Sequence, residues 1–455
     1  MPALLFLAAH LVLPLFGMPA VFHPSLRALP FSARIAAAFA AGAVGLTLEA
    51  TLFSIVGVRW SAVSLSIPLL AASFVLSTQW AGRRSPIAPP LPSARRGVVA
   101  AAVLAGGLAL LHLGLSLATA RATSTDFLLF WGVKGARFAV ARGIDVELLD
   151  SAFSHHLVAD YPPLVPIVSS WSTLWAGEVP WRFAPLLTAL WFLAAVPVVA
   201  VFLRRHLSPD YATAVAAFWT VALAISLVRS TSGGNAEGPL LFFESAALAA
   251  LLAERRQDRD TSRFFPALAL SGAALTKVEG SLAVVLIVAG VALRDFLERR
   301  PRPLSRLLPL AAAPLVALTV WFAFQATHGL PVGYRTHGEL LGLHFQYLTP
   351  VLAGMARYLD AGTAWLSWLL PLVFLTASAR RIRAELLPAL LLVAGLLLFL
   401  VFDYLHDRND PSIRIGWTLP RVSQPGLSAL ILAAGLVASF RSPSYGTDSS
   451  RPAFR

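Results

Sequence analysis

Cysteine is absent from this chain, and charged residues are scarce. Its 455 residues include no Cys, and only 13% of them are Asp, Glu, Lys or Arg. The lack of cysteine excludes disulfide bonds, thiolate chemistry and sulfur-bound zinc. The scarcity of charge, together with a hydrophobic content of 57% and a mean hydropathy of +0.72, excludes an ordinary soluble domain. The composition is typical of a polytopic membrane protein.

Acidic residues are scarcer than basic ones. The chain has 23 Asp and Glu against 36 Lys and Arg, which gives a formal net charge of +13. In a soluble protein this excess would indicate a nucleic-acid partner. In a membrane protein the accumulation of Lys and Arg in cytoplasmic loops explains it, so no nucleic acid is predicted.

Long apolar runs predict an all-α bundle. A membrane span needs roughly 20 apolar residues, and about thirteen segments approach this rule. The predicted spans are approximately 4–22, 35–57, 61–80, 97–119, 184–203, 211–228, 239–253, 264–276, 280–293, 307–325, 363–379, 386–404 and 424–440. No basic segment precedes the first run, because the first Arg is Arg27. We therefore interpret residues 4–22 as a span and not as a cleaved signal peptide.

The arginines predict the orientation of the bundle. Threading the predicted spans places the Arg-rich connections on one side, together with the C-terminal tail. These connections contain Arg27 and Arg34, Arg83 and Arg84, Arg95 and Arg96, Arg204 and Arg205, Arg255 to Arg259, Arg294 to Arg306, and Arg380 to Arg383. By the positive-inside rule this side is cytoplasmic, and the N-terminus lies outside.

The opposite side receives a second set of loops, which are polar. They are residues 120–182, 229–238, 276–280, 326–350 and 405–423. Ionisable groups kept near lipid are costly and mark functional sites by default. We therefore expect one polar site at the outer membrane face, assembled from these loops.

The organisation into domains follows from these segments. Residues 1–82 form an N-terminal group of about three spans, and a Pro- and Arg-rich cytoplasmic linker follows at 83–96. Residues 97–440 form the main membrane domain, which carries the outer loop 120–182. The Ser- and Pro-rich tail 441–455 is predicted to be disordered and cytoplasmic.

The first large outer loop predicts two helices in the plane of the membrane interface. Residues 124–141 place Asp126, Lys134 and Arg137 on one helix face, immediately after a span. One interpretation is a functional carboxylate held at a fixed depth. The other is that Asp126 only caps the helix while Lys134 and Arg137 meet lipid headgroups. Both stay open.

The second helix of this loop begins at Asp160 and ends at Gly177, before Arg182 opens the next span. Helix capping is the simpler role for Asp160. His155 and His156 are candidate metal ligands, although adjacent side chains point apart on a helix.

Four later segments add candidates. Glu237 lies at the outer mouth of a span, either as a helix cap or as part of the site. Lys277 and Glu279 lie in a tight turn between two spans, where a Lys suits a phosphate ligand. The alternative is a Lys277–Glu279 ion pair that closes the turn. Arg421 opens the last span, either in the site or as a headgroup anchor. Loop 326–350 adds a weak acid–base or metal pattern: His328, His337, Glu339 and His344.

In order and sidedness these motifs resemble the GT-C superfamily of integral membrane glycosyltransferases, which use polyprenyl-phosphate sugars. The likeness is to the bacterial branch related to protein-mannosyltransferases and aminoarabinose transferases. The matching segments are Thr125-Asp126-Phe127 with Trp131 and Lys134, Tyr161-Pro162-Pro163-Leu164 with Gly177 and Arg182, Ala236-Glu237-Gly238-Pro239-Leu240, Thr276-Lys277-Val278-Glu279-Gly280, and Arg421 with Gln424 and Pro425. The chain departs from the family by its extra spans before the acidic loop, and by keeping Asp126 alone where the family has paired acids.

The resemblance implies a GT-C-like bundle that moves a sugar from a polyprenyl phosphate to an acceptor hydroxyl on a lipid, glycan or protein. The expected place is the extracytoplasmic face of a bacterial inner membrane, and a single displacement inverts the sugar carbon. The implied roles are the catalytic base for Asp126, substrate positioning for Asp160, Tyr161, Glu237 and Glu279, and lipid-phosphate binding for Lys277, Arg421, Arg137 and Arg182. No metal ligand is assigned, and a role for a divalent cation stays open. The alternatives are a transporter or flippase of lipid-linked glycans, or a binding scaffold, without transferase activity.

Overall fold

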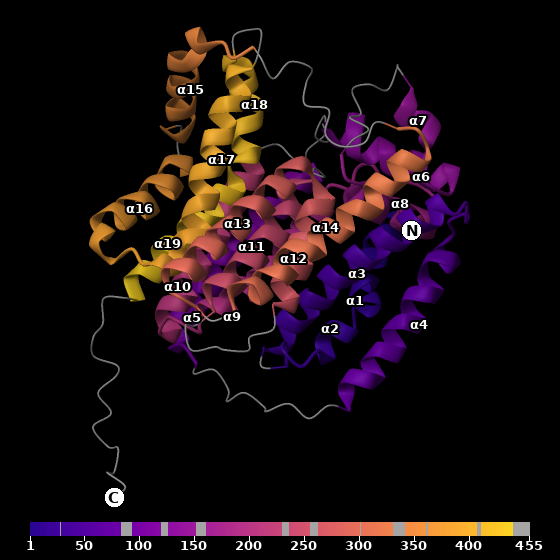
Figure 1. The fold of residues 1–455 in the computed structure, drawn as a ribbon, viewed down its shortest axis with the longest axis horizontal. Helices are drawn as coiled ribbons and strands as arrows, with labels where there is room; N and C mark the ends of the chain where they lie inside the picture. Colours follow the sequence, from indigo (N-terminus) through magenta and orange to yellow (C-terminus); the bar gives the residue numbers. More distant parts are fainter. Residues whose placement is uncertain are drawn as a thin grey trace, which may run out of the picture.

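The structure is a computed structural model, and every regular element in its described residues is a helix. It describes residues 1–27, 29–82, 93–119, 126–151, 161–229, 236–254, 263–300, 302–330, 342–360, 363–406 and 411–439. Within these ranges no strand occurs. Figure 1 shows these helices gathered in one bundle. The predicted all-α class is therefore confirmed for this part of the chain.

The first 82 residues contribute four helices. Their bounds are α1 (Pro2–Phe16), α2 (Pro19–Phe22), α3 (Phe31–Ile55) and α4 (Ala62–Ala81). The predicted span 4–22 is wrong as a single helix, because the chain leaves α1 at Gly17 and restarts at Pro19. A Cβ atom at Gly17 would lie 1.9 Å from the Ala38 carbonyl oxygen of α3, so only glycine allows this close approach.

The next segments form the first outer loop and the helices that follow it. They are α5 (Arg96–Thr119), the π-helical turn η1 (Phe127–Trp131), α6 (Gly132–Ala141), α7 (Val146–Asp150), α8 (Leu164–Ala176), α9 (Leu186–Leu203) and α10 (Pro209–Arg229). As predicted, Gly177 ends α8, and it does so in the left-handed region at φ 80°. In Figure 1, α6, α7 and α8 lie together at the upper right of the bundle.

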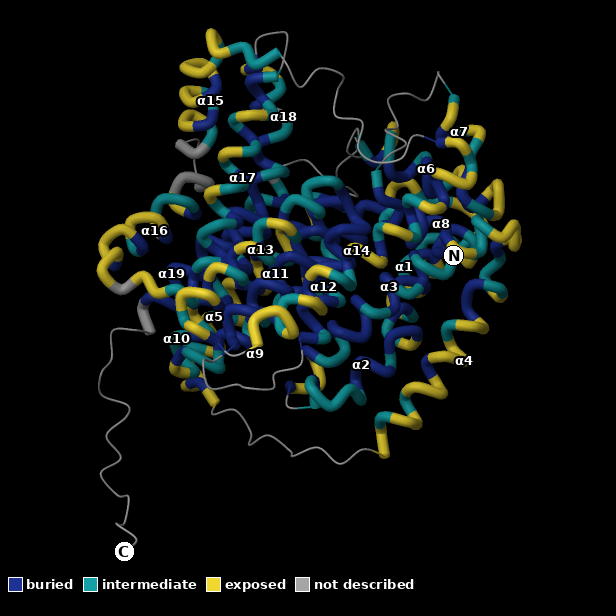
Figure 2. Tube along the Cα trace, in the orientation of Figure 1, coloured by how far each residue is buried: buried dark blue, intermediate teal, exposed yellow. Residues whose placement is uncertain are grey.

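The centre of the bundle consists of four consecutive helices. They are α11 (Glu237–Leu252), α12 (Phe264–Thr276), α13 (Val278–Leu297) and α14 (Pro303–Thr327). Helix α11 is buried along almost its whole length, and its trace is dark blue in Figure 2. It packs between α9 and α12. A helix that is apolar and buried on all sides is the core of the bundle.

The C-terminal part adds shorter elements at the side of this core. They are η3 (Phe345–Tyr347), α15 (Leu348–Asp360), α16 (Thr363–Ala377), η4 (Ala379–Arg381), η5 (Ala384–Leu386), α17 (Leu387–Leu405), α18 (Ser412–Val422) and α19 (Gln424–Ser439). The amphipathic helices α15 and α18 pack against each other and against α17 around a small apolar cluster that includes Val351, Leu400 and Ile415. Both rise at the upper left of Figure 1.

Eight helices are long and apolar enough to cross a membrane. They are α3, α4, α5, α9, α10, α13, α14 and α17, and the last includes the turn before it. The structure therefore has the helices of a polytopic membrane protein. Each of the other predicted spans overlaps a shorter helix, so the count of about thirteen stays a prediction.

The predicted N-terminal group does not stand apart from the remainder. Helix α1 packs on α8, and α3 packs on α9, α12 and α14. Buried residues from both parts belong to one hydrophobic cluster, for example Leu46, Leu164 and Phe243. The predicted linker 83–96 lies mostly outside the described residues, and the predicted tail 441–455 lies wholly outside them.

Candidate functional site

Five charged side chains from four separate segments form a continuous chain of ion pairs. Arg421 Nη1 lies 2.6 Å from Asp126 Oδ2, and Arg421 Nε lies 3.7 Å from Glu237 Oε1. Lys277 Nζ lies 3.3 Å from Glu237 Oε1 and 2.9 Å from Glu279 Oε1. We call these five residues the outer ion-pair chain, after the membrane side predicted for them.

The helices bring these side chains together at their ends. Asp126 precedes η1, and Glu237 is the first residue of α11. Lys277 joins α12 to α13 in extended backbone, with φ −161° and ψ 162°. Arg421 lies in the last turn of α18. Because α11 and α12 run in opposite directions, the start of one meets the end of the other, and the pairs form there.

The five side chains differ in exposure, and Asp126, at one end of the outer ion-pair chain, is the most exposed. The exposed fractions are 4% for Glu237, 8% for Lys277, 14% for Glu279, 18% for Arg421 and 34% for Asp126. The Lys277 pairs therefore form a buried floor, and the Asp126–Arg421 pair forms an accessible rim.

Electrostatics keep the buried part of the chain charged. Burial raises the pKa of the Glu237 carboxyl, but the charges of Lys277 and Arg421 outweigh it and hold that pKa below its usual range. Burial lowers the pKa of the Lys277 ammonium, but the carboxylates of Glu279 and Glu237 raise it well above its usual value. For the Arg421 guanidinium, Glu237 and Asp126 likewise outweigh burial and raise the pKa.

The polar atoms of this chain are not all satisfied. Glu237 Oε2, Glu279 Oε2 and Arg421 Nε are buried and have no hydrogen-bond partner. Native structures leave few such atoms, and those that remain often belong to functional sites. The arrangement therefore keeps unused hydrogen-bonding capacity beside its ion pairs.

Several alternatives from the sequence are settled by these contacts. The Lys277–Glu279 pair that closes the turn is present. Asp126 makes no capping hydrogen bond to η1, so the capping interpretation is wrong for Asp126. The Glu237 carboxyl accepts a hydrogen bond from its own backbone at the start of α11, so a capping role for Glu237 stays open beside its ion pairs. Lys134 does not lie at lipid headgroups, because it is buried with its Nζ 4.2 Å from the centroid of the Phe130 ring.

The other predicted residues fall into three groups: near the outer ion-pair chain, away from it, or outside the described ranges. The Tyr161 ring stacks on Trp131 at 5.9 Å, and Tyr161 lies within electrostatic reach of Lys277. Arg137 pairs with Asp145 at 2.8 Å, so the structure does not bring it to this site. Arg182 is exposed and likewise takes no part in the chain. The predicted residues outside the described ranges are His155, His156, Asp160, His337 and Glu339.

The described residues contain no group of three His, Asp or Glu side chains that could hold a metal ion. His328 Nδ1 lies 2.9 Å from the Phe324 carbonyl oxygen of its own helix. His344 contributes its backbone N–H to the Leu405 carbonyl oxygen at 2.8 Å. Among the described residues of loop 326–350, the histidines and acids therefore do not gather into a metal site.

Sequence reasoning missed Glu244. This residue is buried in α11, its Oε2 atom has no hydrogen-bond partner, and it lies within electrostatic reach of Glu279 and Lys277. It follows Glu237 by seven residues, so both carboxyls occupy one face of the helix. The signal was available as a second acid at helical spacing inside an apolar run.

A small cavity is lined by residues that lie close in sequence to two members of the outer ion-pair chain. Its volume is about 30 Å³, enough for one or two waters. Its lining is largely apolar and includes Phe127 and Pro239, which neighbour Asp126 and Glu237 in sequence. Ser169 also lines it, and the Ser169 Oγ atom has no hydrogen-bond partner.

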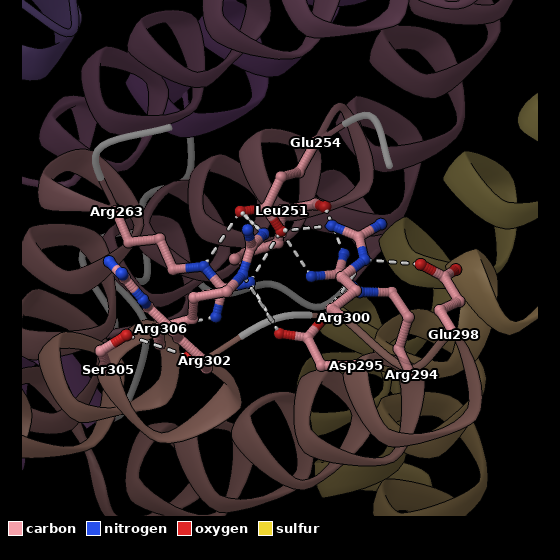
Figure 3. A network of polar contacts seen from close by, with 10 residues as sticks. All are labelled: Leu251, Glu254, Arg263, Arg294, Asp295, Glu298, Arg300, Arg302, Ser305 and Arg306. Atoms are coloured by element: carbon pink, nitrogen blue, oxygen red, sulfur yellow. Dashed lines mark hydrogen bonds and ion pairs between the residues drawn. The ribbon is translucent and has the colours of Figure 1, made fainter. Parts of the chain in front are cut away.

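A second charged cluster lies at the opposite end of the central helices, and Figure 3 shows it. We call it the inner arginine network. It consists of Glu254, Arg263, Arg294, Asp295, Glu298, Arg300 and Arg306. From Arg294 to Arg306 the sequence predicts a cytoplasmic basic connection. The structure adds that Arg294 and Arg300 in this connection are buried against acids.

In comparisons with known proteins, no protein-family model, no curated protein and no solved structure matches this chain.

Proposed function

We propose that this chain is a membrane glycosyltransferase that moves a sugar from a polyprenyl phosphate to an acceptor hydroxyl at the outer membrane face. The observation that supports it most is the Asp126–Arg421 pair at the accessible edge of a buried charge cluster. Sugar transfer from a lipid phosphate needs a base for the hydroxyl and a cation for the departing phosphate, side by side. The GT-C resemblance, with a bacterial inner membrane as the location, implies the same chemistry.

In the proposed reaction, the acceptor oxygen bonds to the anomeric carbon while the bond from that carbon to the phosphate oxygen breaks. The bonding electron pair leaves with the polyprenyl phosphate, and Asp126 takes the hydroxyl proton. A single displacement inverts the anomeric carbon. General-base catalysis typically contributes about 10²–10⁴-fold. A cation beside the departing charge lowers the barrier by about 3 kcal/mol.

We assign the lipid phosphate to Arg421 and a supporting role to Lys277. The Lys277 ammonium is held between two carboxylates, whereas Arg421 lies nearer the surface and keeps Nε without a hydrogen bond. A guanidinium also suits phosphate geometry through two parallel hydrogen bonds. In this proposal Lys277 fixes Glu237 and Glu279, and Arg137 and Arg182 have no part in the reaction.

A proton-coupled transporter of lipid-linked glycans is the second candidate, and Glu244 favours it. A carboxyl group inside an apolar helix is typical of proton relays in transporters. Glu244 is such a group, since it lies in the middle of α11 and is buried there. Transport would depend on Glu244, whereas transfer would depend on Asp126.

The test compares two substitutions in the full-length chain. Membranes that carry the wild type, Asp126→Asn or Glu244→Gln receive a mixture of polyprenyl-phosphate sugars, and released polyprenyl phosphate is measured by mass spectrometry. We expect Asp126→Asn to lower release by about 10²–10⁴-fold. Glu244→Gln should keep most of it.

The matched control is Asp403→Asn. Asp403 pairs with Arg414 at 2.7 Å and is 32% exposed, close to the exposure of Asp126, but it lies outside the outer ion-pair chain. It should leave release unchanged. If Asp126→Asn retained full release while Glu244→Gln abolished movement of the glycan across the membrane, the transporter would replace the enzyme as the conclusion.

A further inference from the structure

Both cations of the outer ion-pair chain are already engaged by carboxylates of the same chain. Lys277 contacts Glu237 and Glu279, and Arg421 contacts Asp126. Three carboxylates face two cations, so these five residues hold no excess positive charge for an incoming phosphate. An anion gains a full partner here only by taking the place of a carboxylate.

The Asp126–Arg421 pair is the one that an anion replaces most readily. It is the most exposed pair, whereas the Lys277 pairs lie buried beneath it. Glu237 lies 3.7 Å from Arg421 Nε, too far for a hydrogen bond. The guanidinium therefore has a donor available for a second phosphate oxygen once Asp126 has moved away.

We infer that Asp126 and Arg421 are an exchangeable pair: a phosphate group takes Arg421, and Asp126 is thereby released to accept a proton. This inference rests on the proposed function, in which the phosphate is that of the lipid-linked donor. While Arg421 Nη1 lies 2.6 Å from Asp126 Oδ2, the guanidinium occupies that carboxylate oxygen and keeps it from an acceptor hydroxyl. The donor consequently binds before the acceptor is activated, and the order of binding follows from the geometry.

The inference predicts an unusual effect of a substitution on phosphate binding. Asp126 competes with the phosphate for Arg421, so removing the carboxylate charge should tighten phosphate binding. A partly exposed ion pair contributes at most about a five-fold factor. We therefore expect Asp126→Asn to bind phosphate about two- to five-fold more tightly than the wild type.

The experiment measures equilibrium binding of farnesyl phosphate and, separately, of inorganic phosphate to the full-length chain in lipid nanodiscs. Asp126→Asn and Asp126→Ser should both tighten binding, because each removes the competing charge. Arg421→Gln should weaken it at least about ten-fold, as loss of a charged partner does. Asp403→Asn, which alters a pair of similar exposure outside the chain, should leave it unchanged. If the Asp126 variants bind both probes more tightly, the phosphate group is what displaces Asp126 from Arg421. If they bind only farnesyl phosphate more tightly, the displacement depends on the lipid.

The outcomes separate this inference from the function on which it rests. If the wild type binds farnesyl phosphate and both Asp126 variants bind it equally or more weakly, the exchange is wrong and the transferase proposal stands. If neither the wild type nor any variant binds farnesyl phosphate, the transferase proposal itself is lost. Folding of each variant is checked by its thermal unfolding in the same nanodiscs.

Discussion

The two charged clusters of this protein differ in composition and in how far they are exposed to solvent. In the inner arginine network four guanidiniums surround three carboxylates, and Glu254 alone lies within 3.5 Å of four of them. In the outer ion-pair chain two cations serve three carboxylates, and its rim is exposed. One helix connects the two, since α11 begins at Glu237 and ends just before Glu254. About 24 Å of buried helix separates them.

This difference indicates different tasks. A closed, buried network of ion pairs adds little net stability, but it is costly to break, because each removed partner leaves an uncompensated charge. It suits a fixed junction between the ends of α11, α12, α13 and α14. A partly exposed, acid-rich chain exchanges partners at a much smaller cost. Substitutions in the two clusters should therefore act on different observables.

The largest effect is expected for Glu254→Gln in the inner network. The change leaves Arg263 and its neighbours with fewer carboxylates inside a buried site, so the free energy of unfolding should fall by about 3–5 kcal/mol. Denaturation of the purified chain in detergent measures it. Glu298→Gln, at the edge of the same network, should cost less, since Glu298 pairs with Arg300 whereas Glu254 lies within 3.5 Å of four guanidiniums. A loss below about 1 kcal/mol for Glu254→Gln would show that the network is not a structural junction.

The next effect is expected for Lys277→Gln in the floor of the outer chain. The neutral amide leaves the buried Glu237 and the partly exposed Glu279 without their shared cation. We expect the free energy of unfolding to fall by about 2–3 kcal/mol, less than for Glu254 because Glu279 is partly exposed. Lys277→Arg keeps the charge and should recover part of this loss. Full recovery of stability by Lys277→Met would contradict a role for the charge.

Periodicity and charge predicted much of the fold. The apolar runs located the helices within a few residues, for example α12 at 264–276, because a lipid or core environment selects the same side chains along a whole helix. Gly177 was predicted to end α8 for a local reason, its left-handed backbone. The break at Gly17 was missed, because it depends on the approach of α3, which no local pattern carries.

The candidate site was predictable in its members and less so in its contacts. The polar loops predicted for the outer side of the membrane contain Asp126, Glu237, Lys277 and Arg421. The structure brings these four residues together. Their pairing was open, because a sequence gives no distances between side chains. The inner network was not predicted at all, since the positive-inside rule describes where arginines lie and not whether they are buried.

The pH dependence of stability gives a third, smaller contrast. The folded-state pKa of Glu237 lies below its unfolded value of about 4.5, so its ion pairs stabilise the fold above that pH. This contribution is lost as the pH falls through the folded-state pKa, at about 1.4 kcal/mol per unit of pKa difference. Glu237→Gln should therefore show a shallower loss of stability below pH 4.5 than the wild type. Melting temperatures between neutral pH and acid measure it, and parallel curves for the two proteins would contradict the paired carboxylate.

The smallest stability effect is expected for Asp126→Asn, although its effect on transfer is large. The Asp126–Arg421 pair is partly exposed, so its loss should change the free energy of unfolding by at most about 1 kcal/mol. Raising the salt from 0.1 to 1 M shortens the screening length from about 10 to 3 Å. The wild type should then lose most of its small advantage over the variant. Denaturation at both salt concentrations measures this, and Glu254→Gln should keep its deficit at high salt because its pairs are buried. A deficit for Asp126→Asn that is large and insensitive to salt would mean that the rim is as closed as the inner network, and an exchange of partners at Arg421 would then be too costly for a substrate to drive.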